Sequence, residues 1–127
     1  MKKFSIKERI KSFGYAFAGM RTLFLEEHNA YLHVLGMVVA IGMGLFLGLS
    51  RLEWVAIVIC IGSVFAMELL NSSIEALADH VNPEYHNQIK KVKDLAAAAV
   101  LVVAMMSVVV GLLVFLPKLL NGISGIK

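Results

Sequence analysis

The architecture of this chain can be read from residues 54–79, WVAIVICIGSVFAMELLNSSIEALAD. The first part, 54–70, is apolar and long enough to cross a bilayer, which takes roughly 17–25 residues. The polar stretch that follows keeps helical spacing until Asn82-Pro83. We therefore expect one helix that crosses the membrane and continues past its surface, ending at the proline.

Four polar residues of this stretch recur at helical intervals: Glu68, Asn71, Glu75 and Asp79. On an α-helix these positions share one narrow face over about three turns. Ionisable groups near membrane depth are costly, and they normally face a protein interior or a wet cavity at a functional site. The spacing therefore predicts a functional site on this face of the helix.

The composition indicates an integral membrane protein. The 127 residues are 59% hydrophobic and 17% charged, and two further apolar runs cover 30–49 and 95–116. Because the first run begins well after residue 1 and two more follow, we expect no cleaved signal peptide. We predict an all-α protein with three transmembrane helices, forming a single domain over 1–127.

The basic residues predict the orientation in the membrane. Most of them precede the first span or separate the second from the third: Lys2, Lys3, Lys7, Arg9, Lys11, Arg21, Lys90, Lys91 and Lys93. The positive-inside rule then places the N-terminus and the loop near 80–94 in the cytoplasm. The net charge of +3 follows from this asymmetry and does not indicate nucleic acid as a partner.

Residues 1–28 form an amphipathic segment in which aromatic and aliphatic side chains alternate with basic ones. Such a segment suits a helix lying at the anionic cytoplasmic interface. It would serve as a simple anchor or help to grip lipid or nucleotide. Gly14 and Gly19 leave open whether it is one helix or two.

Polar residues from all three spans should meet at the cytoplasmic boundary. Glu27 precedes the first span, the Glu68–Asp79 face ends the second, and Lys93 with Asp94 begins the third. Carboxylates suit Mg²⁺, which is usually bound through one or two acids together with substrate phosphates. Phosphoryl transfer depends mainly on positioning and charge compensation, and the types of residue gathered here can supply both.

We assign roles on that basis. Glu27 and Glu75 are candidate Mg²⁺ ligands, and Lys93 would neutralise phosphate charge. Glu68, deeper toward the lipid, is the candidate general base for an alcohol acceptor, and Asn71 would orient its carboxylate or a phosphate oxygen. The chain contains no P-loop and no protein-kinase motif, so any nucleotide site must be built from helix faces and a short loop.

Other interpretations compete with these. A non-enzymatic protein, such as a proton-coupled transporter subunit, would use Glu68 as its carrier acid, and a scaffold would associate through its glycine-rich faces. Asp94 is also a natural N-cap for a helix starting at Leu95, Asp79 a solvated helix-end acid, and His33 an interhelical hydrogen-bond partner or a ligand.

The sequence resembles the small bacterial lipid kinases, the prokaryotic diacylglycerol kinase and undecaprenol kinase family, from about Arg9 to Val114. The resemblance rests on four segments in matching order: GYAFAGMR (14–21) followed by Glu27, ELLNSSIEALAD (68–79), EYH (84–86) and KDLAAAAVL (93–101). EHNAYLH (27–33) is similar to the undecaprenol kinase branch, whereas EYH matches the diacylglycerol kinase branch. The lipid acceptor therefore stays open between the two.

The resemblance implies ATP- and Mg²⁺-dependent phosphorylation of a membrane lipid alcohol in the bacterial inner membrane. It implies a homotrimer with active sites between neighbouring chains. Glu68 would accept the proton beside Asn71, and Glu27 and Glu75 would hold Mg²⁺ on the ATP. The residues implied to contact the nucleotide are Tyr15, Glu27, Glu75, Glu84, Tyr85, His86, Lys93 and Asp94.

Overall fold

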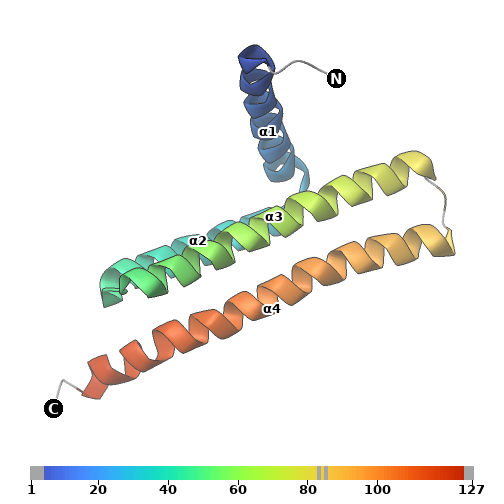
Figure 1. Ribbon diagram of the computed structural model, residues 1–127. Coiled ribbons are helices and arrows are strands. Elements are labelled where there is room, and N and C mark those ends of the chain that lie inside the picture. The colour runs from blue at the N-terminus through green and yellow to red at the C-terminus, as the bar shows by residue number, and fades with distance from the viewer. Residues whose placement is uncertain (1–4, 83, 85, 125–127) are drawn as a thin grey trace.

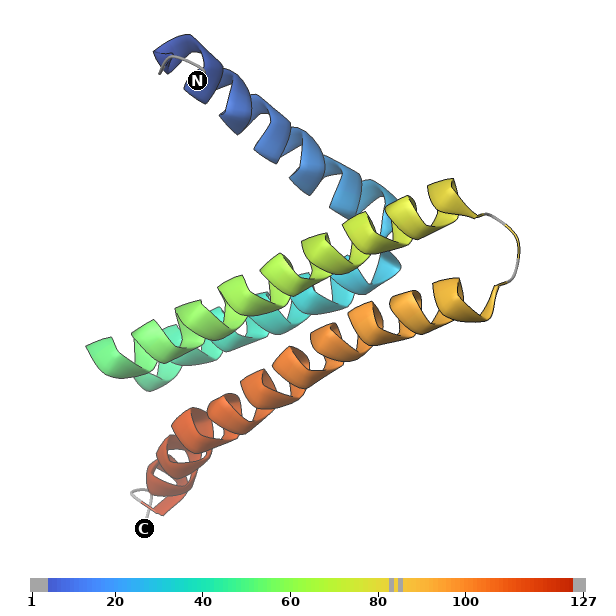
Figure 2. The same ribbon diagram turned by 45° about the vertical axis from the view of Figure 1, so that its right-hand side comes forward.

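The computed structural model describes residues 5–82, 84 and 86–124, and these form four α-helices without strands. Helix α1 spans Ile6–Glu26, α2 His28–Leu47, α3 Arg51–Val81 and α4 Asn87–Ser124. Helices α2, α3 and α4 run side by side in alternating directions, and α1 leaves them at a steep angle (Figures 1 and 2). The predicted all-α architecture is confirmed.

Three of the helices, α2, α3 and α4, are long and apolar enough to span a membrane. Many of their large apolar side chains are exposed, including Leu45 (72%) and Leu113 (72%). Such exposure fits a chain that is solvated by lipid, because outward-facing apolar side chains are then in contact with hydrocarbon. The three predicted spans are confirmed as helices, and the second continues to Val81 as expected.

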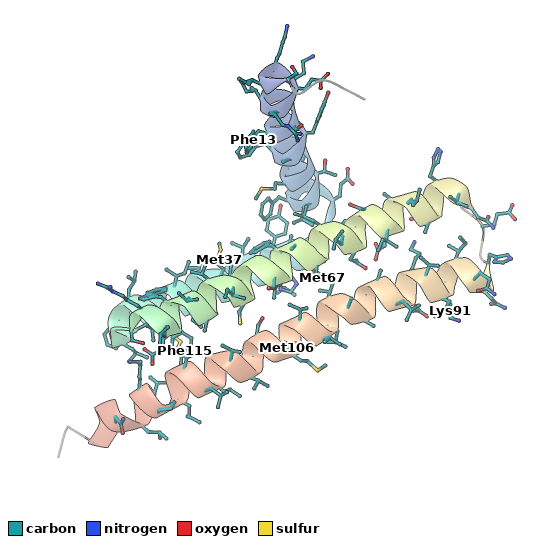
Figure 3. All side chains as sticks on the ribbon, viewed as in Figure 1. Phe13, Met37, Met67, Lys91, Met106 and Phe115 are labelled. Atoms are coloured by element: carbon teal, nitrogen blue, oxygen red, sulfur yellow. The ribbon has the colours of Figure 1, made fainter. Side chains whose placement is uncertain are left out.

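The N-terminal segment is one continuous helix despite Gly14 and Gly19. Ser5 caps its start by accepting a hydrogen bond from the backbone N–H of Glu8 (3.4 Å), and Leu23 is its buried residue. Tyr31 of α2 donates a hydrogen bond to the carbonyl of Phe24 (2.8 Å), which ties the last turn of α1 to α2. The N-terminal part of α1 extends away from the three long helices, and Phe13 projects from its side (Figure 3).

The turn between α2 and α3 lies at the opposite end of α3 from Glu68 and Glu75. Gly48 adopts a left-handed conformation (φ 62°) that ends α2, as glycine does at helix C-termini. Ser50 and Glu53 form a reciprocal capping box that starts α3. Lys118 of α4 pairs with Glu53 (3.2 Å), so this turn is linked to the far end of α4.

Gly44 allows α2 to approach α3 closely. A Cβ added there would lie 2.8 Å from Cη2 of Trp54 and 3.0 Å from Cδ1 of Leu49. We expect Gly44→Ala to destabilise the protein by about 1–3 kcal/mol, because the indole must shift to make room. The control is Gly42→Ala, since nothing lies within 4 Å of a Cβ at that position. Unfolding in mixed micelles measures both, and equal stabilities for the two variants would contradict this packing.

Candidate active site

The polar face predicted on α3 is present, and its residues become more exposed toward the end of the helix. Glu68 and Asn71 are buried, with 2% and 9% of their surface exposed, Glu75 is half-buried and Asp79 is exposed. Because a buried carboxylate is costly unless it is paired, Glu68 needs a partner within the bundle.

A polar groove of about 410 Å³ lies over this face, between α2, α3 and α4. Four of the predicted site residues line it together: Glu27, Glu68, Asn71 and Glu75. Helix α4 contributes only apolar lining to it, namely Ala97, Val100, Leu101 and Ala104. The structure thus gathers the candidate base and both candidate metal ligands in one groove.

Asn71 acts on Glu75 rather than on Glu68. Its Nδ2 donates a hydrogen bond to Oε1 of Glu75 (3.0 Å), which fixes the orientation of that carboxylate. Among the described residues, no partner is found for the buried Oδ1 of Asn71, which therefore remains available as an acceptor. The interpretation that Asn71 orients Glu68 thus gives way to one in which it orients Glu75, one helical turn further along α3.

His33 provides the partner of Glu68. Its Nε2 lies 2.6 Å from Oε1 of Glu68, which makes it an interhelical hydrogen-bond partner, as one of the two interpretations expected. Its imidazole lies near the ring of Phe65 in an edge arrangement, with centroids 6.5 Å apart.

The residues available for a metal are few. Among the described residues, no three His, Cys, Asp or Glu side chains stand close enough to hold a metal ion by themselves. Glu27 and Glu75 do line the same groove, and two carboxylates completed by substrate phosphates suit Mg²⁺. The donor set therefore fits a metal that arrives with a nucleotide.

A second groove of about 360 Å³, the α1–α3 groove, shares Glu27 and Glu75 with the polar groove. Gly19, Thr22 and Glu26 line it from α1. Tyr15 is exposed (74%) and lies outside this groove, but its position precedes Gly19 by one turn on the same helix face. Thr22 and Glu26 are not among the site residues that the sequence predicts, although their spacing from Tyr15 places them on the same face of the helix.

A third groove of about 460 Å³, the loop groove, lies where α3 and α4 leave the bundle. It is lined by Asp79, Asn82, Glu84, His86, Ile89, Lys90, Lys93 and Asp94. Lys93, just before the apolar run of α4, donates a hydrogen bond to Oδ1 of Asp79 (2.7 Å). The carboxylate of Asp79 therefore holds the cationic side chain of Lys93 in the loop groove.

The start of α4 gives Asp94 and His86 structural partners in the loop groove. Asp94 is not an N-cap, because α4 begins at Asn87 and Asp94 pairs with Lys90 inside the helix. His86 serves the start of α4, since its Nδ1 accepts a hydrogen bond from the backbone N–H of Gln88 (3.2 Å). Tyr85 lies outside the described residues.

An apolar cavity of about 260 Å³ continues from the polar groove between the three long helices. The two share Leu32, His33 and Ala104 at their junction. The cavity then extends past Val64, Ile57 and Gly111 to Phe115, which lies on the side of α4 facing α3 (Figure 3). The pair of Glu68 and His33 therefore lies where a polar groove meets an apolar space inside the bundle.

Comparison with known proteins identifies the family. Residues 14–115 match the model of the prokaryotic diacylglycerol kinase family. The chain is 39% identical to the undecaprenol kinase of Bacillus subtilis (strain 168) over 109 residues, which cover 86% of this chain and 89% of the relative. It is 29% identical to the diacylglycerol kinase of Escherichia coli (strain K12), over 79% of this chain and 82% of the relative.

A third relative, the diacylglycerol kinase of Helicobacter pylori (strain ATCC 700392 / 26695), is 34% identical over 76% of this chain and 75% of its own length. The family match includes the whole of α2 and α3, together with the groove residues that they supply. It favours an enzyme over the transporter subunit and the scaffold. The chain therefore belongs to the prokaryotic diacylglycerol kinase family and is a lipid kinase.

Proposed function

We propose that the protein transfers the γ-phosphoryl group of ATP to the hydroxyl of a membrane lipid alcohol, either diacylglycerol or undecaprenol. The observation that carries this proposal is the junction between the polar groove and the apolar cavity at Leu32, His33 and Ala104. A lipid alcohol needs such a junction, because its hydroxyl must reach polar groups while its chains stay in an apolar environment.

On the acceptor side, Glu68 accepts the hydroxyl proton as the oxygen attacks the γ-phosphorus, and the bond from that phosphorus to the bridging oxygen breaks to release ADP. Its burial supports this role, since it keeps bulk water away from the carboxylate and from the phosphoryl group. Asn71 lies one turn further along α3, and its Oδ1, which has no partner among the described residues, can accept a hydrogen bond from the substrate.

On the donor side, Glu27 and Glu75 would hold Mg²⁺ that arrives with the ATP, and Lys93 would compensate phosphate charge. Magnesium bound there would neutralise charge on the phosphates and orient them for transfer. The α1–α3 groove and the loop groove support a nucleotide that extends from Glu75 toward Lys93, because they share Asp79. By family resemblance, Tyr15, Glu84, Tyr85, His86 and Asp94 contact this nucleotide.

We further propose the setting in which the enzyme works. It is a homotrimer in the bacterial inner membrane with its N-terminus in the cytoplasm, and residues 1–127 act as one domain. Helix α1 lies on the cytoplasmic surface with one face in the lipid. The support for this placement is a stripe of exposed apolar side chains at helical spacing: Ile6, Ile10, Phe13 and Phe17.

The test is transfer of labelled phosphate from ATP by the purified protein in mixed micelles, with diacylglycerol and undecaprenol offered separately. We expect a labelled lipid with one of them, formed only when Mg²⁺ is present. The lipid that is labelled names the acceptor.

Two controls make the result decisive. Chelation of Mg²⁺ should stop the transfer, and micelles without a lipid alcohol should yield no labelled lipid. If the folded protein labels neither lipid at saturating ATP and Mg²⁺, the proposed substrates are wrong.

A further inference from the structure

The carboxylate of Glu68 has two oxygens, and the structure shows one of them engaged. Oε1 lies 2.6 Å from Nε2 of His33, on the neighbouring helix. Glu68 is 2% exposed, whereas the side chain of His33 is 21% exposed. A buried carboxylate needs a hydrogen-bond donor, and Asn71 does not supply it because its amide is directed to Glu75.

The imidazole of His33 is itself held by aromatic packing. It meets Phe65 edge-on, with ring planes at 74°, and Phe65 in turn packs against Phe24, with ring centroids 6.2 Å apart. Phe24 belongs to the last turn of α1, where its carbonyl accepts the hydrogen bond from Tyr31. A side chain restrained in this way can fix the direction of the group to which it donates.

We propose that His33 is a positioning residue for the phosphoryl transfer, an inference that rests on the proposed function. Its Nε2–H donates to Oε1 of Glu68 and holds the carboxylate so that Oε2 is directed toward the acceptor hydroxyl. His33 lines both the polar groove and the apolar cavity, so it stands where that hydroxyl must arrive. The aromatic contacts of Phe65 and Phe24 keep the imidazole in this orientation.

A matched pair of substitutions tests the proposal. His33→Gln retains an N–H donor at a similar reach, whereas His33→Met has nearly the same size and shape as Gln but no donor. We expect His33→Met to lower kcat by about 10²-fold with an unchanged KM for ATP, since misplacement of a reacting group by about 1 Å costs that much. His33→Gln should recover most of the lost turnover.

Three results would overturn the proposal: wild-type kcat in His33→Met, a loss that appears only in the KM for ATP, or equal loss in both variants. Equal loss would require an imidazole that itself exchanges protons. His80→Met is the control, because His80 is an exposed histidine of α3 outside the grooves, and its kcat should not change.

A second measurement does not depend on activity. His33→Met, Glu68→Met and the double variant form a cycle in which the melting temperature in micelles is compared. We expect the double variant to lose clearly less than the sum of the single losses, because both remove the same contact. If the two single losses in melting temperature simply add in the double variant, the contact between His33 and Glu68 is contradicted. If the losses are coupled but the wild-type protein transfers no phosphate to either lipid, only the proposed substrates are refuted.

Discussion

Glu68→Gln is expected to abolish turnover, lowering kcat by about 10³-fold, because general acid–base catalysis contributes 10²–10⁴-fold. The amide is almost isosteric with the carboxylate and can still form a hydrogen bond with His33, so the packing around this buried position should survive. An amide cannot accept the hydroxyl proton at neutral pH, however. Transfer of labelled phosphate at saturating ATP, Mg²⁺ and lipid measures the effect.

The matched control is Glu53→Gln, the same substitution at the opposite end of α3, where the carboxylate pairs with Lys118. It should leave turnover unchanged. Size-exclusion chromatography should show the same assembly for wild type and both variants. If Glu68→Gln retained more than about a tenth of the wild-type kcat, Glu68 would not be the general base.

Glu75→Gln is expected to abolish turnover through a different step. Its carbonyl oxygen can still accept the hydrogen bond from Asn71, so the side chain keeps its place. The negative charge is lost, and a neutral oxygen is a poor substitute for a carboxylate on Mg²⁺. We expect at least about a 10²-fold weaker affinity for Mg²⁺-ATP, since even the groups that only orient metal ligands are worth 10–100-fold.

Nucleotide binding separates the two variants. Titration of labelled ATP at several Mg²⁺ concentrations should show weak binding by Glu75→Gln and wild-type binding by Glu68→Gln. If Glu75→Gln bound Mg²⁺-ATP as tightly as the wild type, Glu75 would not be a metal ligand. If Glu68→Gln bound Mg²⁺-ATP weakly, both acids would contribute to nucleotide binding.

The sequence predicted the spans and the polar face of α3 because both depend on local periodicity. The apolar runs and the interval from Glu68 to Asp79 define a helix and one of its faces without any tertiary contact. The sequence also predicts that Glu27 lies near Glu68 and Glu75. Successive spans run in opposite directions, so the start of the first span and the end of the second lie on the same side of the bundle.

Other features depend on tertiary geometry and could not be read from spacing. Whether Asn71 would turn toward Glu68 or Glu75 is a rotamer choice that only packing decides. The contact of His33 with Glu68 depends on the relative rotation of α2 and α3. Helix α4 begins at Asn87, before the position that the apolar run predicts. The lysines ahead of Asp94 resemble a loop in the sequence, but as a helix they gain the Lys90–Asp94 pair.

The continuity of α3 has a consequence for the membrane in which the enzyme works. Its 31 residues extend about 46 Å at the usual rise, whereas the hydrocarbon core of a bilayer is about 30 Å thick. Because α3 is one continuous helix, the distance of Glu68 from the other end of α3 is fixed, whereas the distance between the two headgroup layers changes with acyl-chain length. We therefore expect bilayer thickness to affect how readily an acceptor hydroxyl meets Glu68, and turnover to depend on hydrophobic mismatch.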